Sequence, residues 1–367
     1  MKFQCRRKEL LEAFSLAASV VSGKGGRPGP QEVLMEILPD GTQVLSATDL
    51  EVSLKRRWKT EGVEVAEAGA AAIPADKSLS ILRELPGEEV TVEREGNTVH
   101  IFSRKSRFKV VALPAEEYPP LPEATWANKV VLPSDLFLKM VNQTGFATAT
   151  ERVHYSLNGV YLVVEKGGVR MVGTDGRRLA VHAAKVKGLK DEVLKGIVPN
   201  KGIRLFEKLA GNGDEVTFSL EKNQLFLGAE GTEASTLLIE GTYPDFNRVI
   251  PKGNDRVLEI SVSDLLSGLR QASILAGEEA KAVRFTMEKD KVTLQSESAG
   301  AGEAKVELPA VYDAAPVDLQ FNPLFFMDFL RQVDQERVAI KFKDNETAAL
   351  IQVGSEYTYV VMPLVAH

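Results

Sequence analysis

The residues best suited to chemistry lie in one short stretch, VGTDGRRLAVH, from Val172 to His182. A Thr-Asp-Gly step followed by two arginines fits three different structures. The glycine and the basic residues could hold a phosphate, and Asp175 could act as a general acid or base. The same residues also build tight turns between strands, because Asp and Thr side chains accept hydrogen bonds from the backbone. The choice among these three decides whether the chain is an enzyme.

Other sequence patterns that would support catalysis are missing. The glycine-rich segment around Lys24 departs from the phosphate-binding consensus GxxxxGK[ST], since Lys24 is followed by Gly25. Neither a dinucleotide-binding GxGxxG nor a nucleophile elbow GxSxG is present. Metal-site spacing is also missing among the four histidines, which are His100, His154, His182 and His367. We therefore expect a protein that is not an enzyme and that needs no metal and no cofactor.

The composition is that of a globular protein with two or three domains. The 367 residues are 44% hydrophobic and 26% charged. No apolar run approaches the roughly 18 residues of a membrane-spanning helix, and the N-terminus lacks the layout of a signal peptide. The single cysteine, Cys5, fits a reducing compartment, so we expect a cytoplasmic protein without a membrane partner. The net charge of −6 argues against nucleic acid unless basic residues gather on one concave surface.

The chain repeats itself at an interval of roughly 125 residues. Segments that start at Ile73, Val198 and Phe321 each read as a helix, a turn and two alternating strands. A second set of three segments places an acidic residue, Glu9, Asp135 or Asp264, at the start of an amphipathic helix, and strand-like alternation follows each helix. Ser134 and Ser263 stand where an N-cap residue would stand. The sequence therefore predicts three copies of one unit, each with two helix-plus-strands halves.

The repeat also supplies a twin for the opening stretch. Thr48 and Asp49 in SATDLEVSL lie one repeat before Thr174 and Asp175. A catalytic aspartate would not need a copy in the neighbouring repeat, whereas a turn between strands would. We therefore interpret the Thr-Asp pair as a structural turn.

These patterns predict an α+β protein of three similar domains, each with two helices packed on one side of curved antiparallel sheets. The domain boundaries fall in turn-rich segments and give domains at residues 1–125, 126–252 and 253–367. Sheet edges left open at the two ends of such a chain are a liability, which a head-to-tail ring with a second copy removes. The predicted helices carry a recurring set of basic residues: Lys77, Arg83, Lys139, Lys201, Arg204, Lys208, Arg270 and Arg331. Recurrence on corresponding helices favours a shared basic surface over ordinary solvated helix faces.

At this point the sequence resembles a known family, the bacterial DNA polymerase III beta subunits, or sliding clamps. The resemblance runs from MKF at the start to YVVMPL at Tyr359–Leu364. Its most specific segments are ATDLE, YSLNGV, TDGRRLA, YPDFNRVIP and YVVMP, in the right order and spacing. It implies the DNA clamp fold, in which a head-to-tail homodimer of three-domain chains forms a ring around double-stranded DNA. Such a clamp reads no sequence, performs no catalysis and confers processivity on the replicative DNA polymerase; a clamp loader places it on DNA.

The resemblance also implies three sets of site residues. The first set would bind a short peptide of the polymerase, the loader and other proteins with a clamp-binding motif: Leu157, Thr174, Gly176, Arg177, Arg178, Leu179, Pro244, Arg248, Val249, Asn322, Phe325, Ala348, Val360, Val361, Met362, Pro363 and Leu364. In this set the apolar residues would form a slot, and Thr174, Arg178 and Arg248 would form its polar rim. The second set would contact DNA: Lys24, Arg27, Lys77, Arg83, Tyr155 and Lys201. The third set would form the dimer interface: Lys105, Arg107, Phe108, Ile274, Leu275, Glu297 and Glu303.

Two rival hypotheses remain at the level of sequence. One is a repeat-built binding protein without a role on DNA, and the other is a hydrolase whose site is not recognised. A native mass that shows only a monomer would exclude the ring.

Overall fold

The computed structural model describes residues 1–21, 30–60, 62–150, 155–189, 193–211, 213–277, 282–298, 300 and 302–364. The chain divides into two compact units. The first consists of Met1–Leu138 and Lys201–Leu238, and the second consists of Lys139–Asn200 and Ile239–His367. These units follow contacts within the fold and leave the domain boundaries at residues 125 and 252 a prediction.

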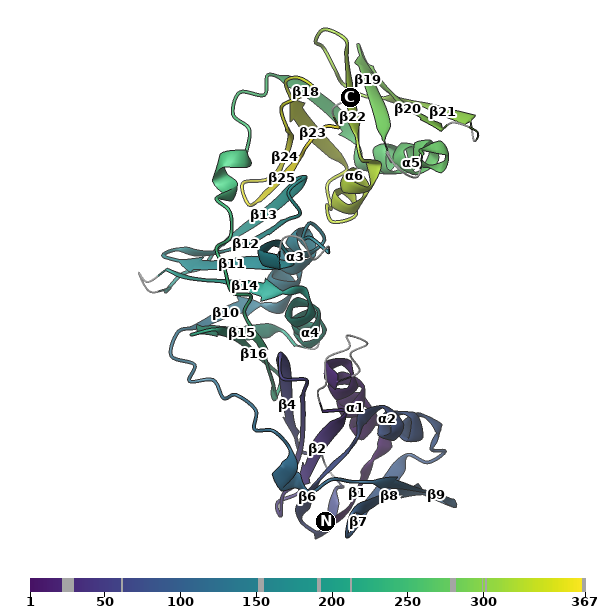
Figure 1. Ribbon diagram of the computed structural model, residues 1–367, viewed down its shortest axis with the longest axis vertical. Coiled ribbons are helices and arrows are strands. Elements are labelled where there is room, and N and C mark those ends of the chain that lie inside the picture. The colour runs from purple at the N-terminus through teal and green to yellow at the C-terminus, as the bar shows by residue number, and fades with distance from the viewer. Residues whose placement is uncertain are drawn as a thin grey trace. The chain divides into compact units, whose positions relative to one another are not determined.

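The described part of the first unit contains two antiparallel sheets, with strand orders β5-β1-β7-β8-β9 and β10-β15-β16-β17-β4-β3-β2-β6. Helices α1 and α2 lie side by side, and α1 packs on β3 and β4 (Figure 1). The elements are β1 (Lys2–Arg6), α1 (Arg7–Val21), β2 (Glu32–Ile37), β3 (Gln43–Thr48), β4 (Val52–Trp58), β5 (Glu64–Glu67), β6 (Gly69–Pro74), α2 (Ala75–Glu84), β7 (Glu89–Glu95), β8 (Thr98–Ser103), β9 (Ser106–Val111), β10 (Lys129–Pro133), α4 (Asn200–Ala210), β15 (Glu215–Glu221), β16 (Gln224–Ala229) and β17 (Thr232–Leu237).

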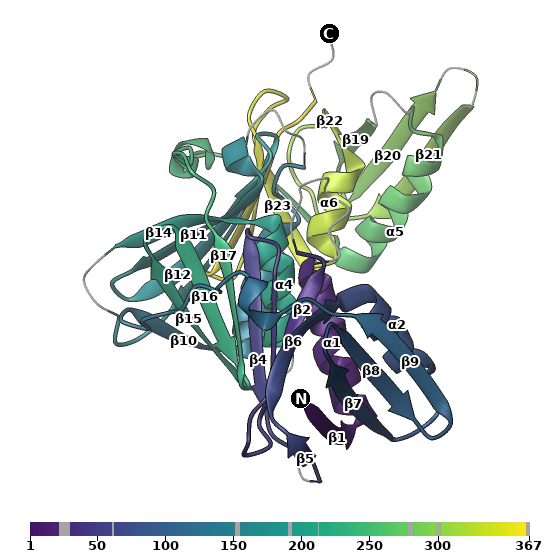
Figure 2. The same cartoon turned by 60° about the horizontal axis from the view of Figure 1, so that its bottom comes forward.

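In the second unit, the described strands again form two antiparallel sheets, in the orders β14-β11-β12-β13-β25-β24-β23-β18 and β21-β20-β19-β22. Helix α5 packs on α6 and on β20 and β21, an arrangement that Figure 2 shows from a second side. The elements are β11 (Gly159–Glu165), β12 (Gly168–Thr174), β13 (Arg178–Lys185), β14 (Leu194–Pro199), β18 (Arg256–Ser261), α5 (Val262–Ala272), β19 (Val283–Glu288), β20 (Lys291–Ser298), β21 (Gly302–Pro309), β22 (Val317–Phe321), α6 (Pro323–Leu330), β23 (Arg337–Phe342), β24 (Ala349–Val353) and β25 (Tyr357–Val361). Short 3₁₀ turns, η2 (Tyr155–Leu157), η3 (Phe246–Val249) and η4 (Ser273–Leu275), join them, as η1 (Ala115–Glu117) does in the first unit.

All six predicted helices are present, with α3 (Ser134–Gly145) completing the set. Glu9, Asp135 and Asp264 lie in the first turns of α1, α3 and α5, where a carboxylate interacts favourably with the helix dipole.

The two predicted N-caps are wrong. Ser134 is already the first residue of α3, and its buried hydroxyl has no hydrogen-bond partner, while Asp135 accepts from the amide of Leu136 at 2.7 Å. In α5 the cap is Ser261, which accepts from the amide of Asp264, two residues before the predicted Ser263. In both cases the helix begins directly at the end of a strand, so the cap position is displaced.

The strand pairing extends beyond the sequence repeats. β4 pairs with β17 in the first unit, and β13 pairs with β25 in the second. In each pair, one strand lies in one predicted domain and its partner lies in the next, so each eight-stranded sheet joins two repeats. The backbone hydrogen bonds across these pairs are therefore part of what links the repeats.

Candidate functional site

The Thr-Asp stretch is a turn between β12 and β13. The carboxylate of Asp175 accepts from the amides of Arg177 (2.9 Å) and Arg178 (3.0 Å). The hydroxyl of Thr174 accepts from the amide of Gly176 and donates to the carbonyl of Arg178. These bonds confirm the structural interpretation and leave Asp175 occupied by the backbone rather than free for acid–base chemistry.

Arg178 extends this turn towards α6 of the same unit. Its guanidinium pairs with Asp175 at 2.9 Å and with Asp328 at 2.8 Å, and it donates to the carbonyl of Phe146. The group also lies 4.6 Å from the ring centroid of Phe325. Burial opposes the charged form, but Tyr359 and the two carboxylates outweigh burial and raise the pKa of Arg178 above its ordinary value. The side chain is only 11% exposed, so its role in a polar rim would be to position the turn.

An apolar cluster lies beside this turn on one face of the β13–β25 pair. Four residues of the predicted peptide site belong to it: Leu157, Leu179, Ala348 and Val360. All four are buried, with exposed fractions of 8% or less. We name the cluster and the residues at its margin the β13–β25 surface.

The margin of the β13–β25 surface is exposed. Met362 is 42% exposed and Val249 is 55% exposed, and the side chain of Arg248 is 85% exposed although it pairs with Asp245. Gly176, Arg177 and Pro244 are exposed as well, while Asn322, Phe325 and Leu364 are half-buried and Thr174 and Pro363 are buried. An apolar floor with exposed apolar and cationic margins is suited to an apolar peptide that carries polar flanks.

Strand alternation separates two neighbouring residues of the predicted set. Val360 belongs to the apolar cluster, whereas Val361 packs into a different core that includes Phe326, Phe329 and Tyr359. Phe325 packs against that second core too. Val361 and Phe325 therefore support the surface from behind.

Sequence reasoning missed several members of the cluster: Val172, Val181, Ile197, Ile239, Tyr243, Phe246 and Leu350. A signal was available for two of them, because Val181 follows Leu179 and Leu350 follows Ala348 at the strand period of two. Tyr243 stacks on Tyr161 with ring centroids 4.6 Å apart, and burial raises the pKa of its hydroxyl. The tyrosine is therefore a neutral part of the floor.

The residues predicted to contact DNA are spread over both units. Lys77 and Arg83 are exposed on α2, and Tyr155 is 60% exposed in η2. Lys201 forms an ion pair with Asp49, the twin of Asp175. Lys24 and Arg27 lie outside the described residues.

The residues predicted for the dimer interface lie at or beside two sheet edges. Lys105, Arg107 and Phe108 belong to β9 and the turn before it, and β9 is the last strand of its sheet. β21 is the edge strand of the four-stranded sheet and carries Glu303, directly opposite Glu297 on β20. The nearby Ile274 is 77% exposed, and Leu275 is half-buried. One edge is thus basic and the other acidic.

No metal-binding geometry is found among the described residues, where no three His, Cys, Asp or Glu side chains gather. Within the same described set, every helix is too short or too polar to cross a membrane.

Comparison with known proteins covers nearly the whole chain. Residues 1–122, 131–245 and 247–365 match the N-terminal, central and C-terminal domain families of the DNA polymerase III beta subunit. The beta sliding clamp of Chlamydia pneumoniae is 30% identical over 368 residues, which span all of both chains. That of Escherichia coli K12 is 30% identical over 370 residues, covering 99% of this chain and 100% of its own.

Solved structures agree with this comparison. A sliding clamp from Pseudomonas aeruginosa bound to griselimycin is 28% identical and has a TM-score of 0.93, with both chains fully covered. A sliding clamp from Bartonella birtlesii bound to the same compound is 27% identical, with a TM-score of 0.94 and the same coverage.

Proposed function

The chain belongs to the DNA polymerase III beta subunit family, and from that membership we propose how its surfaces serve DNA replication. It is a sliding clamp that encircles duplex DNA and tethers the replicative polymerase, and so confers processivity. Tethering acts by raising the effective concentration of the polymerase at the primer end. The main observation in support of this function is that the family match includes all three repeats rather than one.

The ring forms from two copies that meet head to tail. In support, the basic edge at β9 and the acidic edge at β21 are complementary in charge and each has a free side for strand pairing. Glu297 and Glu303 face each other, and like charges in direct register are unfavourable within one chain. Lys105 and Arg107 of a second copy would relieve that repulsion. Three domains per chain, with boundaries at residues 125 and 252, then give a ring of six.

Duplex DNA passes through the ring without sequence readout and without catalysis by the clamp. Lys77, Arg83 and Tyr155 offer exposed groups for phosphate contacts, which position DNA but carry no sequence information. Lys24 and Arg27 are proposed for the same role from sequence alone. Lys201 would contribute only when its ion pair with Asp49 opens.

Retention on circular DNA tests encirclement. After a clamp loader acts on a nicked circle, the protein should remain bound at high salt and should leave when the circle is cut. Equal retention on linear DNA would show that the protein binds without encircling. Native mass measurement should show a dimer, and the charge reversal Arg107→Glu should shift it towards monomer.

The β13–β25 surface is the proposed docking site for the peptides of the polymerase and the clamp loader. Its apolar cluster accepts the anchors, and flexible Met362 adapts to different partners. Met362→Asp should weaken binding of a polymerase-derived peptide at least tenfold and leave the dimer intact.

Val257→Asp supplies the matched control for this test. Val257 is 38% exposed on β18 of the same unit, close to the 42% of Met362, and it lies outside the apolar cluster. Equal peptide affinity of Met362→Asp and the unmodified protein would show that the site is misplaced.

A further inference from the structure

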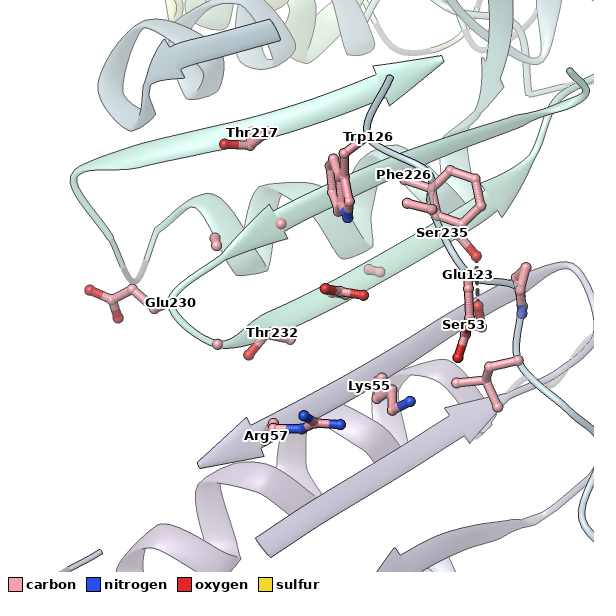
Figure 3. A pocket seen from close by; sticks show the side chains of 18 of the residues that line it. Ser53, Lys55, Arg57, Glu123, Trp126, Thr217, Phe226, Glu230, Thr232 and Ser235 are labelled. Atoms are coloured by element: carbon pink, nitrogen blue, oxygen red, sulfur yellow. Dashed lines mark hydrogen bonds between the residues drawn. The ribbon is translucent and has the colours of Figure 1, made fainter. Parts of the chain in front are cut away.

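A large pocket opens on the eight-stranded sheet of the first unit and serves none of the roles described above. Its volume is about 950 Å³, and it is lined by β4, β15, β16, β17 and the linker before β10. Figure 3 shows Trp126 of the linker standing over the strands, with Lys55 and Arg57 of β4 along one side.

The pocket occupies the same place in the repeat as the β13–β25 surface. Ser53 on β4 pairs in register with Ser235 on β17, as Leu179 on β13 pairs with Val360 on β25. The bond from the amide of Leu237 to the carbonyl of Glu51 likewise corresponds to that from Met362 to Arg177, both 2.8 Å long. The two sites are therefore equivalent in backbone and different in side chains.

Two hydroxyl groups in the floor of this pocket are hydrogen-bonded to each other. The hydroxyls of Ser53 and Ser235 lie 2.6 Å apart and are bonded to each other, and both residues are buried. Phe226 lies beside them and is 5% exposed. The floor thus combines polar and aromatic groups.

The aromatic wall is held in a costly conformation. Trp126 has a φ of 55°, in the left-handed region that non-glycine residues rarely adopt. The carboxylate of Glu221 fixes it by accepting from the Trp126 amide (2.9 Å), the Thr125 amide (3.0 Å) and the Thr125 hydroxyl (2.9 Å). A Cβ on Gly228 would come within 3.2 Å of the indole, so glycine permits this close approach. Strain that is held in place by several bonds is typical of binding sites.

The charges that line the pocket have no ion-pair partner in the described part of the chain. They are the cations Lys55, Arg57 and Lys129 and the anions Glu123, Glu215, Glu230 and Glu233. Nucleic acid would meet four carboxylates here, and a purely basic segment would meet three cations. A polypeptide that carries both charges fits better, because the cations of β4 lie beside the anion of β17, with Glu233 in register with Lys55, and its apolar side chain would pack against Trp126 and Phe226.

We propose that this pocket is a second docking site, which takes an extended peptide of a partner protein with an aromatic or apolar residue next to an acidic one. The acidic residue pairs with Lys55 and Arg57 on β4, and the apolar residue packs against Trp126. The site would allow one clamp chain to hold a second partner segment while the β13–β25 surface is occupied.

Differential selection from a random dodecapeptide display library tests the proposal on the full-length protein. The library is selected on the unmodified chain and, in parallel, on the triple variant Lys55→Glu, Arg57→Glu, Trp126→Gly. Peptides of the β13–β25 surface bind both proteins and drop out of the comparison. We expect a set enriched only on the unmodified chain that shares an aromatic or apolar residue beside Asp or Glu.

Synthetic copies of the enriched peptides are then titrated in a Trp58→Phe background, where Trp126 is the remaining tryptophan of the two in the sequence. Binding should change its fluorescence and should weaken at least tenfold in Lys55→Glu. The proposal would be overturned if no sequence were differentially enriched, or if the peptides bound Lys55→Glu as tightly as the unmodified chain. A fluorescence change caused by single-stranded oligothymidine rather than by peptide would overturn it as well. The triple variant should still be retained on circular DNA. That result would show that a loss of peptide binding is a loss of the second docking site and not a failure of the clamp function.

Discussion

The two turns that carry Thr-Asp share one backbone and differ in what they support. In the first unit, Asp49 accepts from the amides of Glu51 and Val52, just as Asp175 does from Arg177 and Arg178 in the second. The hydroxyl of Thr48 repeats both bonds of Thr174. Behind the turns, however, the first unit has the Ser53–Ser235 hydroxyl pair and the second has the apolar pair of Leu179 and Val360.

The Thr-Asp turn and its ion pair to a helix, which we call a joint, are present in both units, whereas the side chains of the adjoining strands differ. Each turn forms an ion pair with the third helix that follows it along the chain, with Lys201 of α4 paired to Asp49 and Asp328 of α6 paired to Arg178. The positive charge is on the helix in one unit and on the strand in the other. The joint therefore has the same structural role in both units. The side chains on the adjoining sheet face differ, and so does the chemistry that they offer.

The largest expected effect comes from removing the charge at each joint. Arg178→Ala should destabilise the second unit by about 3 kcal/mol, because it leaves the partly buried Asp175 without a cation and leaves Asp328 with Arg331 alone. Lys201→Ala should cost no more than about 1 kcal/mol, since the lysine is 34% exposed and its ion pair is with Asp49 alone among the described residues. Hydrogen exchange of the β13–β25 and β4–β17 amides in urea measures the two costs separately. Similar losses in both ladders would contradict the asymmetry between the joints.

An intermediate effect concerns pH. His182 on β13 is buried, and its imidazole bonds to the side-chain oxygen of Gln143 at 2.6 Å. Burial, followed by the charge of Lys139, lowers its pKa from 6.5 to about 4. The unfolded chain therefore binds this proton more readily, so stability is full above pH 6.5 and falls as the pH drops towards 4, by about 2 kcal/mol at pH 5.

The first unit supplies the comparison for this titration. The register places Arg56 of β4 where β13 has His182, so the first unit has no histidine at this position. Exchange from the β13–β25 amides should speed up between pH 7 and pH 5, after correction for intrinsic rates, more than exchange from the β4–β17 amides. His182→Gln should remove the excess, and an excess that persists in this variant would assign the pH dependence to another group.

The smallest expected effect comes from substitutions at the residue with positive φ in each turn. Leu50 has a φ of 75° and is 58% exposed, and it occupies the position of Gly176, whose φ is 86°. Leu50→Gly should stabilise the first unit, and Gly176→Ala should destabilise the second, each by about 1 kcal/mol. A Cβ at Gly176 meets no atom within 4 Å, so the change reports the backbone alone. Thermal unfolding measures both, and shifts of the same sign would show that the turns are not equivalent.

Local patterns in the sequence predicted much of this fold. The helices and the turns depend on residues a few positions apart, which is why Glu9, Asp135 and Asp264 mark helix starts correctly. The pairing of β13 with β25 depends on residues nearly half the chain apart, and no local pattern encodes its register. For the same reason the sequence did not reveal that Asp328 binds Arg178, nor that Val360 and Val361 belong to different cores.

For a related reason, the sequence predicted part of the candidate site but did not predict the pocket beside Trp126. Its floor residues are apolar in any reading of the strands, whereas the pocket beside Trp126 depends on a linker that folds back onto a sheet. A glycine in the sequence often indicates a left-handed φ, but at this position the residue is Trp126, so nothing in the sequence predicts its conformation. Its support by Glu221 links positions 95 and 96 residues apart.

The long-range ladder between β13 and β25 has a consequence for the synthesis of the chain. The ribosome completes β13 at Lys185 and does not begin β25 until Tyr357. At translation rates of 5–20 residues per second, that interval lasts roughly 10 to 30 seconds. Throughout this time the nascent chain carries a long, largely apolar strand whose final partner does not yet exist. The free edge of β13 is therefore a place where newly made chains can pair with each other and where a chaperone would help.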